Sequence, residues 1–338
     1  MYENAFHQQD ISTLNFLVTG GGGFIGSNLV GYLLTHGAKY VRVLDDFSNG
    51  HRSNLTEFMD LPNFELLEGD IRDLETCKTA MVGMDYVSHQ AALGSVPRSI
   101  ADPATTNAVN ISGFLNMCIA LKDSPTVKRM VYAASSSTYG DSPTLPKVEA
   151  VIGKPLSPYA VTKYVNELYA DVFGKTYGTD IIGLRYFNVF GPKQSPDGAY
   201  AAVIPLFMQA LKDDVAPTIN GDGEQTRDFT FIANVVQANV RGFFASKEAA
   251  NDVYNVACGE RITINYLWDS LQNAAHSALK PLHGPERQGD VRDSLADISK
   301  AERLLGYKPA VSVRDGLKVT WDYFNPLNPR RGLLTDAE

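Results

Sequence analysis

"NFLVTGGGGFIGSN", residues 15–28, joins a short apolar run to a glycine-rich turn and a longer mixed segment. The apolar run predicts a buried strand, and the segment after it predicts a helix that ends at Gly37. Gly20, Gly23 and Gly26 have the spacing G-x-x-G-x-x-G, in which a tight turn and close backbone approach favour glycine. A helix that begins at such a turn offers free N–H groups and its positive end to a phosphate. The stretch therefore predicts the start of a dinucleotide-binding fold.

Strands and helices alternate from this stretch to about residue 190. The strands are predicted at 15–20, 40–47, 63–70, 86–92, 129–137 and 180–188, and the later helices at 74–83, 104–122 and 158–177. This alternation indicates an α/β protein with a Rossmann-like, doubly wound parallel sheet that is covered on both faces.

The pattern changes after about residue 190. Residues 191–205 are rich in glycine, proline and small side chains and predict a loop or the entry to a short helix. The remaining elements are two short strands within 217–232, a strand at 252–258, and helices near 234–246, 263–279 and 299–306. The chain thus divides into an extension (1–14), a main domain (15–189) and a smaller mixed α/β lobe (190–338), and we expect some of the lobe's segments to return to the main domain.

Charge and composition exclude several classes of function. The net charge of −8 argues against a nucleic-acid partner, because phosphate backbones need basic surfaces. Cys77, Cys118 and Cys258 have neither metal-like nor disulfide-like spacing, which fits a reducing compartment. The sequence shows no membrane span and no signal-peptide pattern, and it suggests no metal site. We therefore expect a cytoplasmic protein without a membrane or nucleic-acid partner.

Acidic residues at strand ends refine the expected nucleotide. Asp45 ends the second predicted strand, where a carboxylate can accept hydrogen bonds from an adenosine ribose and would repel a 2′-phosphate. This favours NAD over NADP, so the main domain is predicted to bind NAD. Asp70 and Ile71 end the third strand, where they would flank the adenine.

"SPYAVTKY", residues 157–164, places Tyr159 and Lys163 one helical turn apart on the same face. An ammonium group beside a phenol favours the phenolate, so we expect Lys163 to lower the pKa of Tyr159. Such a tyrosine can exchange a proton with a substrate hydroxyl near neutral pH. Ser135 ends the strand before this helix, at the ligand edge of the sheet, where it could orient that hydroxyl.

Seven motifs together resemble the extended short-chain dehydrogenase/reductase family, and most of all its UDP-hexose 4-epimerases that act on N-acetylated sugars. The resemblance covers residues from about 15 to 310. The motifs are "TGGGGFIGSNL", "GDIRD", "HQAALGSVPRS", "ASSSTYGD", "SPYAVTKYVNE", "RYFNVFGP" and "GDGEQTRDFTFI".

The resemblance implies roles for individual residues. Ser135, Tyr159 and Lys163 match the catalytic residues, and Asn188, Arg227 and Arg287 match residues that hold the UDP diphosphate or sugar. Guanidinium groups suit that role because they bind phosphate through two parallel hydrogen bonds. The resemblance also assigns Ser136 and Ser137 to the substrate. Besides the glycines, Asp45, Asp70, Ile71, Tyr159 and Lys163, the implied cofactor contacts are Phe24, Ile25, Asp46, Gln90, Ala91, Ala92 and Tyr186.

Enzymes that catalyse several different reactions share this fold. The two residues after the catalytic serine or threonine distinguish some of these reactions. Related 4,6-dehydratases have Asp-Glu directly after the catalytic serine or threonine, and related uronate decarboxylases have a glutamate there. This chain has Ser136 and Ser137, which cannot do that acid–base work at neutral pH. The resemblance then implies an isomerase in which Tyr159 removes the 4-hydroxyl proton while hydride moves from carbon 4 to NAD. The 4-keto sugar swings over, and hydride returns to its opposite face.

The sequence narrows the sugar substrate but does not specify a single one. Ser294 matches a position where glucose-restricted relatives have tyrosine, and serine leaves space for a 2-acetamido group. Gly94 stands where glucose-type relatives have lysine. We therefore expect UDP-GlcNAc and UDP-GalNAc as the preferred pair, with UDP-Glc and UDP-Gal as further substrates. The alternatives are the corresponding UDP-N-acetylhexosaminuronates, a nucleotide-sugar 4-reductase, or a non-enzymatic NAD-binding protein, which usually lacks the tyrosine or the lysine.

The family resemblance also implies a homodimer and a role in polysaccharide biosynthesis. Subunits of this family usually pair through two helices each, which form a four-helix bundle. The predicted helices at 104–122 and 158–177 are the candidates. Their apolar residues Ile111, Phe114, Leu115, Leu168 and Phe173 are compatible with such an interface.

Overall fold

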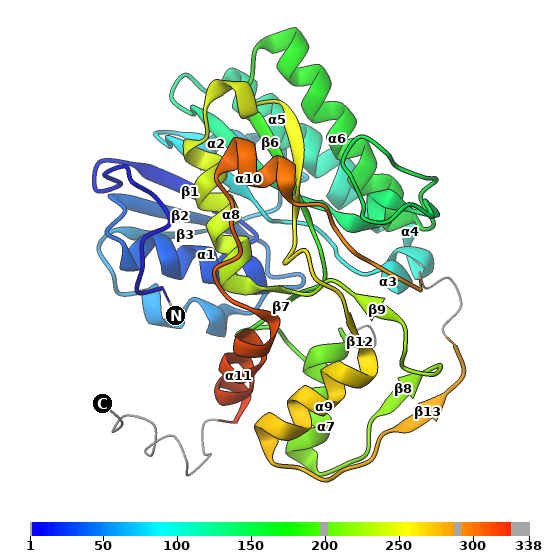
Figure 1. Cartoon of the computed structure of the whole chain (residues 1–338). Coiled ribbons are helices and arrows are strands. Elements are labelled where there is room, and N and C mark those ends of the chain that lie inside the picture. Colours follow the sequence, from blue (N-terminus) through cyan, green and yellow to red (C-terminus); the bar gives the residue numbers. More distant parts are fainter. Residues whose placement is uncertain (1, 197–201, 287–291, 326–338) are drawn as a thin grey trace.

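A seven-stranded parallel sheet forms the centre of the molecule (Figure 1). The computed structural model describes residues 2–196, 202–286 and 292–325. The strand order is β11-β6-β5-β4-β1-β2-β3, which confirms the predicted Rossmann-like fold. The strands are β1 (Asn15–Thr19), β2 (Tyr40–Asp45), β3 (Phe64–Glu68), β4 (Tyr86–His89), β5 (Arg129–Ser135), β6 (Ile181–Tyr186) and β11 (Asp252–Val256).

The strand order reverses direction at β1, and this reversal determines where a ligand can bind. The chain runs from β1 to β2 and β3 on one side and then crosses to β4, β5 and β6 on the other. The loops after β1 and β4 therefore diverge and leave a crevice beyond the carboxyl ends of the strands, where open α/β sheets bind their ligands.

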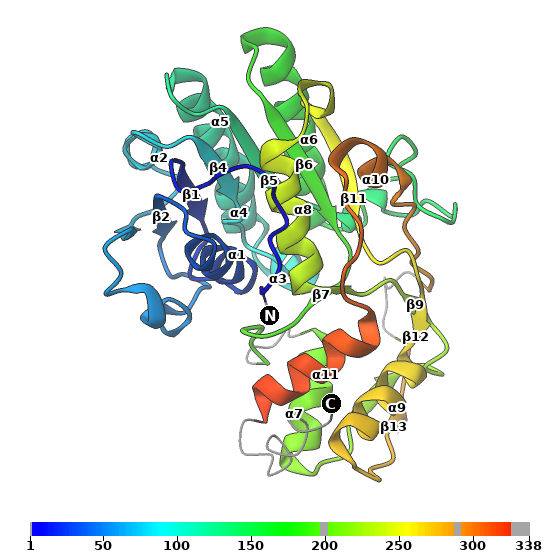
Figure 2. The same cartoon turned by 60° about the vertical axis from the view of Figure 1, so that its left-hand side comes forward.

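Helices cover both faces of the sheet (Figure 2). One face carries α1 (Phe24–Thr35) and α8 (Ile232–Phe244), which contact each other. The other face carries α2 (Leu74–Met81), α5 (Phe114–Asp123) and α6 (Pro158–Tyr177), which form a second contacting layer. Each layer buries its own apolar cluster against the sheet, because parallel strands are hydrophobic on both faces.

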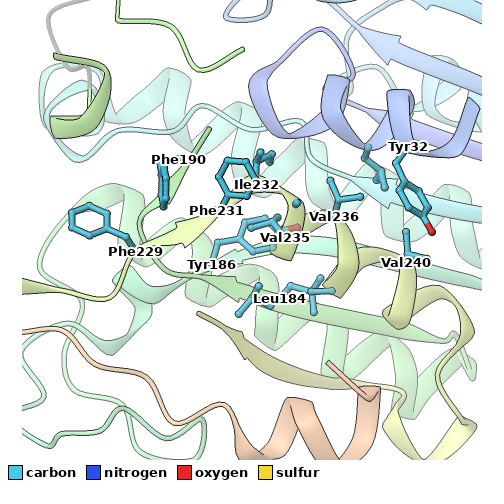
Figure 3. Close-up of a cluster of buried hydrophobic side chains, with 14 of the residues drawn as sticks. Tyr32, Leu184, Tyr186, Phe190, Phe229, Phe231, Ile232, Val235, Val236 and Val240 are labelled. Carbon is cyan, nitrogen blue, oxygen red and sulfur yellow. The ribbon is translucent and has the colours of Figure 1, made fainter. Parts of the chain in front are cut away.

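The larger apolar cluster joins α1, α8 and β6 (Figure 3). Tyr32 of α1 and Val236 of α8 are fully buried, and Leu184 of β6 lies beneath them. Almost every residue of α8 is buried. The second half of the chain therefore contributes both a helix and, through β11 beside β6, a strand to the main domain.

The predicted helix at 104–122 is not a single α-helix. It consists of α4 (Pro103–Asn107), a π-helical turn η3 (Ala108–Gly113) and α5. The buried Asn110 lies in the π turn, where it accepts a hydrogen bond from the Leu93 N–H and donates one to the Leu93 carbonyl. A Cβ at Gly113 would lie 2.6 Å from Ile71. The wide turn thus fits the helix against the loop after β4 and the end of β3.

The smaller lobe lies at the carboxyl edge of the sheet, around three helices (Figures 1 and 2). The helices are α7 (Val203–Asp213), α9 (Ile264–Ala275) and α11 (Val313–Phe324). Its short strands pair as β8 (Thr218–Asn220) with β13 (Leu282–Gly284), β9 (Thr226–Arg227) with β12 (Ile262–Thr263), and β10 (Thr230–Phe231) with β7 (Val189–Phe190). α7, α11 and the short α3 (Val96–Ala101) were not predicted, whereas α10 (Ser299–Leu305) was.

The N-terminal extension packs on α1 through aromatic contacts. The Phe6 ring stacks on Tyr32 with 5.2 Å between the ring centroids. The Tyr2 hydroxyl donates a hydrogen bond to Asn28 Oδ1 at 3.0 Å. The extension therefore covers part of α1 rather than pairing with the sheet.

Candidate active site

The glycine loop between β1 and α1 is so closely packed that two of its positions admit no side chain. Gly20 has φ +68°, and a Cβ there would lie 2.7 Å from the backbone nitrogen of Ala91. A Cβ at Gly26 would lie 2.2 Å from the carbonyl oxygen of Gly20. Because α1 begins at Phe24 with a glycine as its N-cap, no side chain caps its first N–H groups. This is the cradle that a dinucleotide diphosphate requires.

Asp45 at the end of β2 holds the glycine loop in place. Its Oδ2 accepts a hydrogen bond from the Gly22 N–H and its Oδ1 accepts one from the Phe47 N–H, both at 2.8 Å. Burial raises the pKa of this carboxyl, and the two backbone N–H groups oppose that rise. Each carboxylate oxygen has a second lone pair, so Asp45 can still accept from a ribose hydroxyl. Asp46 is exposed and accepts hydrogen bonds from Ser48.

A first cavity of about 490 Å³ lies beside the glycine loop. It contains most of the residues that were predicted to contact the cofactor. The predicted residues in its lining are Gly20, Gly23, Phe24, Ile25, Gly26, Asp45, Asp46, Ile71, Gln90, Ala91 and Ala92. Lining residues that the sequence did not single out include Asn49, Ser95, Arg98 and Lys193.

Asp70 and Tyr186, two of the predicted cofactor residues, do not line the first cavity, and Tyr159 and Lys163 do not line it either. The Tyr186 hydroxyl donates to Gln90 Oε1 at 3.2 Å and accepts from Asn239 Nδ2 at 2.8 Å, so it supports a lining residue. Asp70 is bound to Arg72, which lowers the pKa of the Asp70 carboxyl. Neither side chain belongs to the described lining of the cavity.

The predicted catalytic residues converge at the carboxyl ends of β5 and β6. Ser135 ends β5, and its Oγ accepts hydrogen bonds from the Ser137 N–H at 3.1 Å and the Ser137 hydroxyl at 2.9 Å. Tyr159 lies in the first turn of α6, which begins after the N-cap Ser157 with a proline at its first position. The Ser135 side chain lies close enough to the Tyr159 phenol to lower its pKa. The sequence thus folds so that the serine and the tyrosine meet.

Lys163 lies one turn along α6 and binds the backbone of β5. Its Nζ donates a hydrogen bond to the Ala133 carbonyl at 2.8 Å and lies 5.9 Å from the centroid of the Tyr159 ring. Burial lowers the pKa of Lys163 to about 8. The ammonium group is therefore anchored beside the phenol and does not bond to it.

The electrostatics of Tyr159 differ from the prediction. Tyr159 remains partly exposed, yet the protein around it raises the pKa of its phenol, and the nearby Ser135 side chain opposes that rise. The expectation that Lys163 lowers the pKa of Tyr159 is therefore wrong for this structure. The physical reason is that desolvation outweighs a charge that points toward a carbonyl.

A second cavity of about 830 Å³ lies between the sheet edge and the smaller lobe. Its lining includes Asn188, Arg227 and one face of α7, and it shares Ser95 and Ala202 with the first cavity. Asn188 Nδ2 donates to the Asp228 carbonyl at 2.8 Å. Arg227 Nη1 donates to the carbonyls of Thr226 and Arg292.

The remaining predicted substrate residues are placed less directly. Arg287 lies outside the described residues. Ser136, Ser137 and Ser294 do not belong to the described lining of either cavity. Ser136 and Ser137 form the short turn that follows Ser135. The backbone N–H of Ser294 donates to the Thr226 carbonyl at 3.2 Å, which brings this segment next to Arg227.

Asp228 organises this region, although the sequence analysis did not single it out. It is fully buried, and its carboxylate accepts hydrogen bonds from the Cys258 N–H at 3.0 Å and the Ala296 N–H at 3.1 Å. These bonds tie Cys258 and Ala296 to the turn between β9 and β10. Burial raises the pKa of Asp228 to about 7. The motif "RDF" could have pointed to it, but only the fold shows what it binds.

We expect Asp228→Asn to destabilise the protein by about 1–3 kcal/mol, because the amide cannot accept hydrogen bonds on both sides. The folded protein holds a proton on Asp228 from about pH 4 to about pH 7 that the unfolded chain has lost. The contribution of Asp228 to the free energy of unfolding therefore falls as the pH rises from about 4 to about 7. The Asn variant lacks this pH dependence. Urea unfolding at pH 5 and pH 7.5 measures it, with exposed Asp60→Asn as the control. An equal stability difference from wild type at both pH values would contradict the assignment.

Comparisons with known proteins agree with this geometry. The model of the "NAD dependent epimerase/dehydratase family" matches residues 16–257. The chain is 38% identical to a UDP-N-acetylglucosamine 4-epimerase from Methanobrevibacter ruminantium in complex with UDP-N-acetylmuramic acid, with a TM-score of 0.88 over 93% of this chain and 99% of that one.

Two further solved structures resemble the chain closely. A UDP-glucose 4-epimerase from Thermotoga maritima with UDP-glucose is 35% identical, with a TM-score of 0.87 over 93% of this chain and 99% of that one. A variant of a UDP-glucuronic acid 4-epimerase from Bacillus cereus, in complex with NAD and a fluorinated UDP-sugar, is 30% identical, with a TM-score of 0.85 over 93% of this chain and 100% of that one. The three structures thus share one fold and differ in their named sugars.

Proposed function

Because this chain belongs to the NAD dependent epimerase/dehydratase family, we propose that it interconverts UDP-GlcNAc and UDP-GalNAc by 4-epimerisation through a transient 4-keto sugar. UDP-Glc and UDP-Gal are further substrates. The observation that carries the proposal is the meeting of Ser135 and Tyr159 at the carboxyl ends of the strands, with Lys163 beside them. The residues after Ser135 are serines, so the carboxylates that a dehydratase would need are missing from these two positions.

The residues of the first cavity fit NAD. The glycine loop leaves room for a diphosphate at the start of α1, and the Asp45 carboxylate suits an unphosphorylated adenosine ribose. Ile71 offers an apolar wall for the adenine. When bound, NAD supplies the hydride acceptor and donor for carbon 4 of the sugar.

The protein's own groups move and hold the proton. Tyr159 Oη takes the proton from the 4-hydroxyl and later returns it, while Ser135 orients that hydroxyl through its own hydrogen bonds. Lys163, fixed on the Ala133 carbonyl, keeps a positive charge beside the phenol. Since burial raises the pKa of Tyr159, the phenol needs these neighbours to lose its proton.

We propose that the second cavity holds the UDP-sugar. Asn188 and Arg227 would bind the diphosphate or sugar, together with Arg287, and Ser136 and Ser137 would face the sugar. The apolar face of α7 supplies part of the remaining wall, together with residues of 95–100 and 217–220. A firm hold on the nucleotide and a loose hold on the sugar let the keto sugar turn between the two half-reactions.

The sugar is tested by incubating purified protein separately with UDP-GlcNAc, UDP-Glc and the two uronates, UDP-GlcNAcA and UDP-GlcA, without added cofactor. We expect the highest kcat/KM with UDP-GlcNAc. A preference for either uronate would replace the proposal by the uronate alternative. In a parallel incubation with added NADH, a 4-reductase would instead consume the NADH, and the purified protein would not retain bound NAD.

Ser294→Tyr is expected to lose activity on UDP-GlcNAc and to keep activity on UDP-Gal. The segment that carries Ser294 is fixed beside Arg227, so a tyrosine ring there would fill space next to the nucleotide-sugar. The ratio of kcat/KM for the two substrates measures the effect, with Ser294→Ala as the small control. Equal activity of the tyrosine variant on both sugars would refute the role of residue 294 in selecting the sugar.

We propose a homodimer that pairs α6 and the α4–α5 region. Val161, Leu168 and Val172 expose an apolar stripe along α6, with 45%, 49% and 51% of their surface accessible. Phe114 and Phe173, which were expected to be compatible with the interface, are instead buried inside the subunit. They are unavailable to a partner, because they pack in the cluster between the helices and the sheet.

The domain assignment and the location of the protein also remain proposals. Residues 15–189 would hold NAD and residues 190–338 the UDP-sugar, with α8, α10 and β11 belonging to the first unit. Among the described residues, no helix is long and apolar enough to cross a bilayer. We propose a cytoplasmic location, which fits three cysteines without disulfide-like spacing, and a role in polysaccharide biosynthesis, which the family resemblance implies.

A further inference from the structure

Two side chains from separate segments of the first cavity's wall bond to each other. Arg98 belongs to α3, which follows β4, and Asn49 belongs to the loop that follows β2. Arg98 Nη2 donates a hydrogen bond to Asn49 Oδ1 at 2.9 Å, and both residues line the cavity. We propose that this pair is a latch that holds α3 over the first cavity and retains bound NAD between turnovers.

The strand order places the latch over the glycine loop. β1 lies between β4 and β2 in the sheet. The segments after β4 and β2 therefore rise on either side of the loop that follows β1. A hydrogen bond between those two segments joins the two sides of the crevice in which a dinucleotide would lie.

Asn49 rests on a fixed base. The His51 N–H and Asn54 Nδ2 both donate to the Gly22 carbonyl at 2.9 Å. A Cβ at Gly50 would lie 2.8 Å from the backbone of Gly22. The loop that carries Asn49 is therefore packed directly on the glycine loop. A displacement of the Asn49 loop would also displace the backbone that is expected to bind the diphosphate.

α3 reaches its position through an unusual backbone turn. Ser95 has φ +100°, which side chains other than glycine rarely adopt, and such strain concentrates at functional sites. Its hydroxyl accepts a hydrogen bond from the Arg98 N–H at 3.3 Å. Residues of α3 and its N-cap also line the second cavity. The position of α3 thus affects both cavities. The hydrogen bond from Arg98 to Asn49 fixes that position relative to the loop after β2.

Arg98 has donors left for an anion. A guanidinium carries five N–H donors, and among the described residues that of Arg98 donates to Asn49 and forms no ion pair. Lys193, another cation in the lining, is paired with Glu57 at 2.8 Å. The remaining N–H groups of Arg98 suit the diphosphate of NAD, since guanidinium groups bind such anions through two hydrogen bonds. The inference rests on the proposed function because it takes NAD as the occupant.

The test is the rate at which purified holoenzyme releases NAD, followed by rapid gel filtration and chromatography of the freed nucleotide. The variants are Arg98→Ala, Arg98→Lys and Asn49→Ala. Arg52→Ala is the matched control, because Arg52 lies next to the same loop, pairs with Glu68 and does not line the cavity. Circular dichroism checks the fold of each variant.

We expect Arg98→Ala to release NAD about tenfold faster than wild type, because charge-assisted hydrogen bonds are the stronger ones. Asn49→Ala should release it about threefold faster, since it loses the latch and keeps the charge. Arg98→Lys should fall between wild type and Arg98→Ala, and Arg52→Ala should match wild type.

A wild-type release rate in Asn49→Ala overturns the latch, even if Arg98→Ala is fast, because charge alone would then explain the effect. A wild-type rate in Arg98→Ala overturns it as well. If Arg98→Ala does not fold, Asn49→Ala decides by itself. The measurement contains no sugar, so it can fail while the proposed epimerisation stands, or succeed while the sugar assignment fails.

Discussion

Tyr159→Phe is expected to lower kcat about 1,000-fold, which is within the range that positioned acid–base groups contribute. The phenylalanine keeps the ring but has no hydroxyl to take the proton from the substrate or to interact with Ser135. The steady-state rate with UDP-GlcNAc measures the loss. The melting temperature and the bound NAD should stay near wild type, because the ring and the cradle are unchanged.

Tyr177→Phe is the matched control for this prediction. Tyr177 ends the same helix, its side chain is half exposed, and its ring contacts Phe173. Its variant should turn over at the wild-type rate. Wild-type turnover by Tyr159→Phe would instead remove the phenol from the mechanism and leave the Ser135 hydroxyl as the group that must move the proton.

Gly26→Ala is expected to destabilise the protein by about 3 kcal/mol, because overpacking against a rigid neighbour costs that much. The added Cβ would lie 2.2 Å from the Gly20 carbonyl oxygen, which is backbone and cannot turn aside. The displaced loop should also lose at least about tenfold in NAD affinity, which corresponds to 1.4 kcal/mol. Urea unfolding and the NAD content after purification measure the two effects.

Gly31→Ala separates this effect from a general cost of alanine in α1. A Cβ at Gly31 would meet only side-chain atoms of Phe58, the nearer at 3.3 Å. Alanine also favours the helix over glycine, so this variant should keep its NAD and nearly all of its stability. If both variants behaved alike, the close approach at Gly26 would not be what selects glycine there.

Local sequence patterns were enough to predict the parallel sheet, the glycine loop and the helix that carries Tyr159 and Lys163. The apolar run before Gly20, the glycine spacing and the strand-end Asp45 are features of adjacent residues, and each lies where the pattern predicted it. Tyr159 and Lys163 are likewise one turn apart on one helix. These predictions succeeded because they depend on helix and strand periods, which the sequence displays directly.

The predictions that failed depend on contacts between distant segments. The π turn at Asn110 arises where the helix meets Leu93 and Ile71. The pKa of Tyr159 depends on how deeply the fold encloses the phenol, which a spacing of four residues does not contain. Asp228 and the Arg98–Asn49 pair bind groups 30 to 68 residues away. No periodicity in the sequence marks such pairs.

The most direct test of the account is NMR of UDP-GlcNAc incubated with the purified protein in D₂O, without added cofactor. We predict that UDP-GalNAc forms and that carbon 4 keeps its original hydrogen, because the enzyme removes and returns that hydrogen through its own bound NAD. Deuterium at carbon 4, or no interconversion of any UDP-hexose until NADH is added in stoichiometric amounts, would contradict the account.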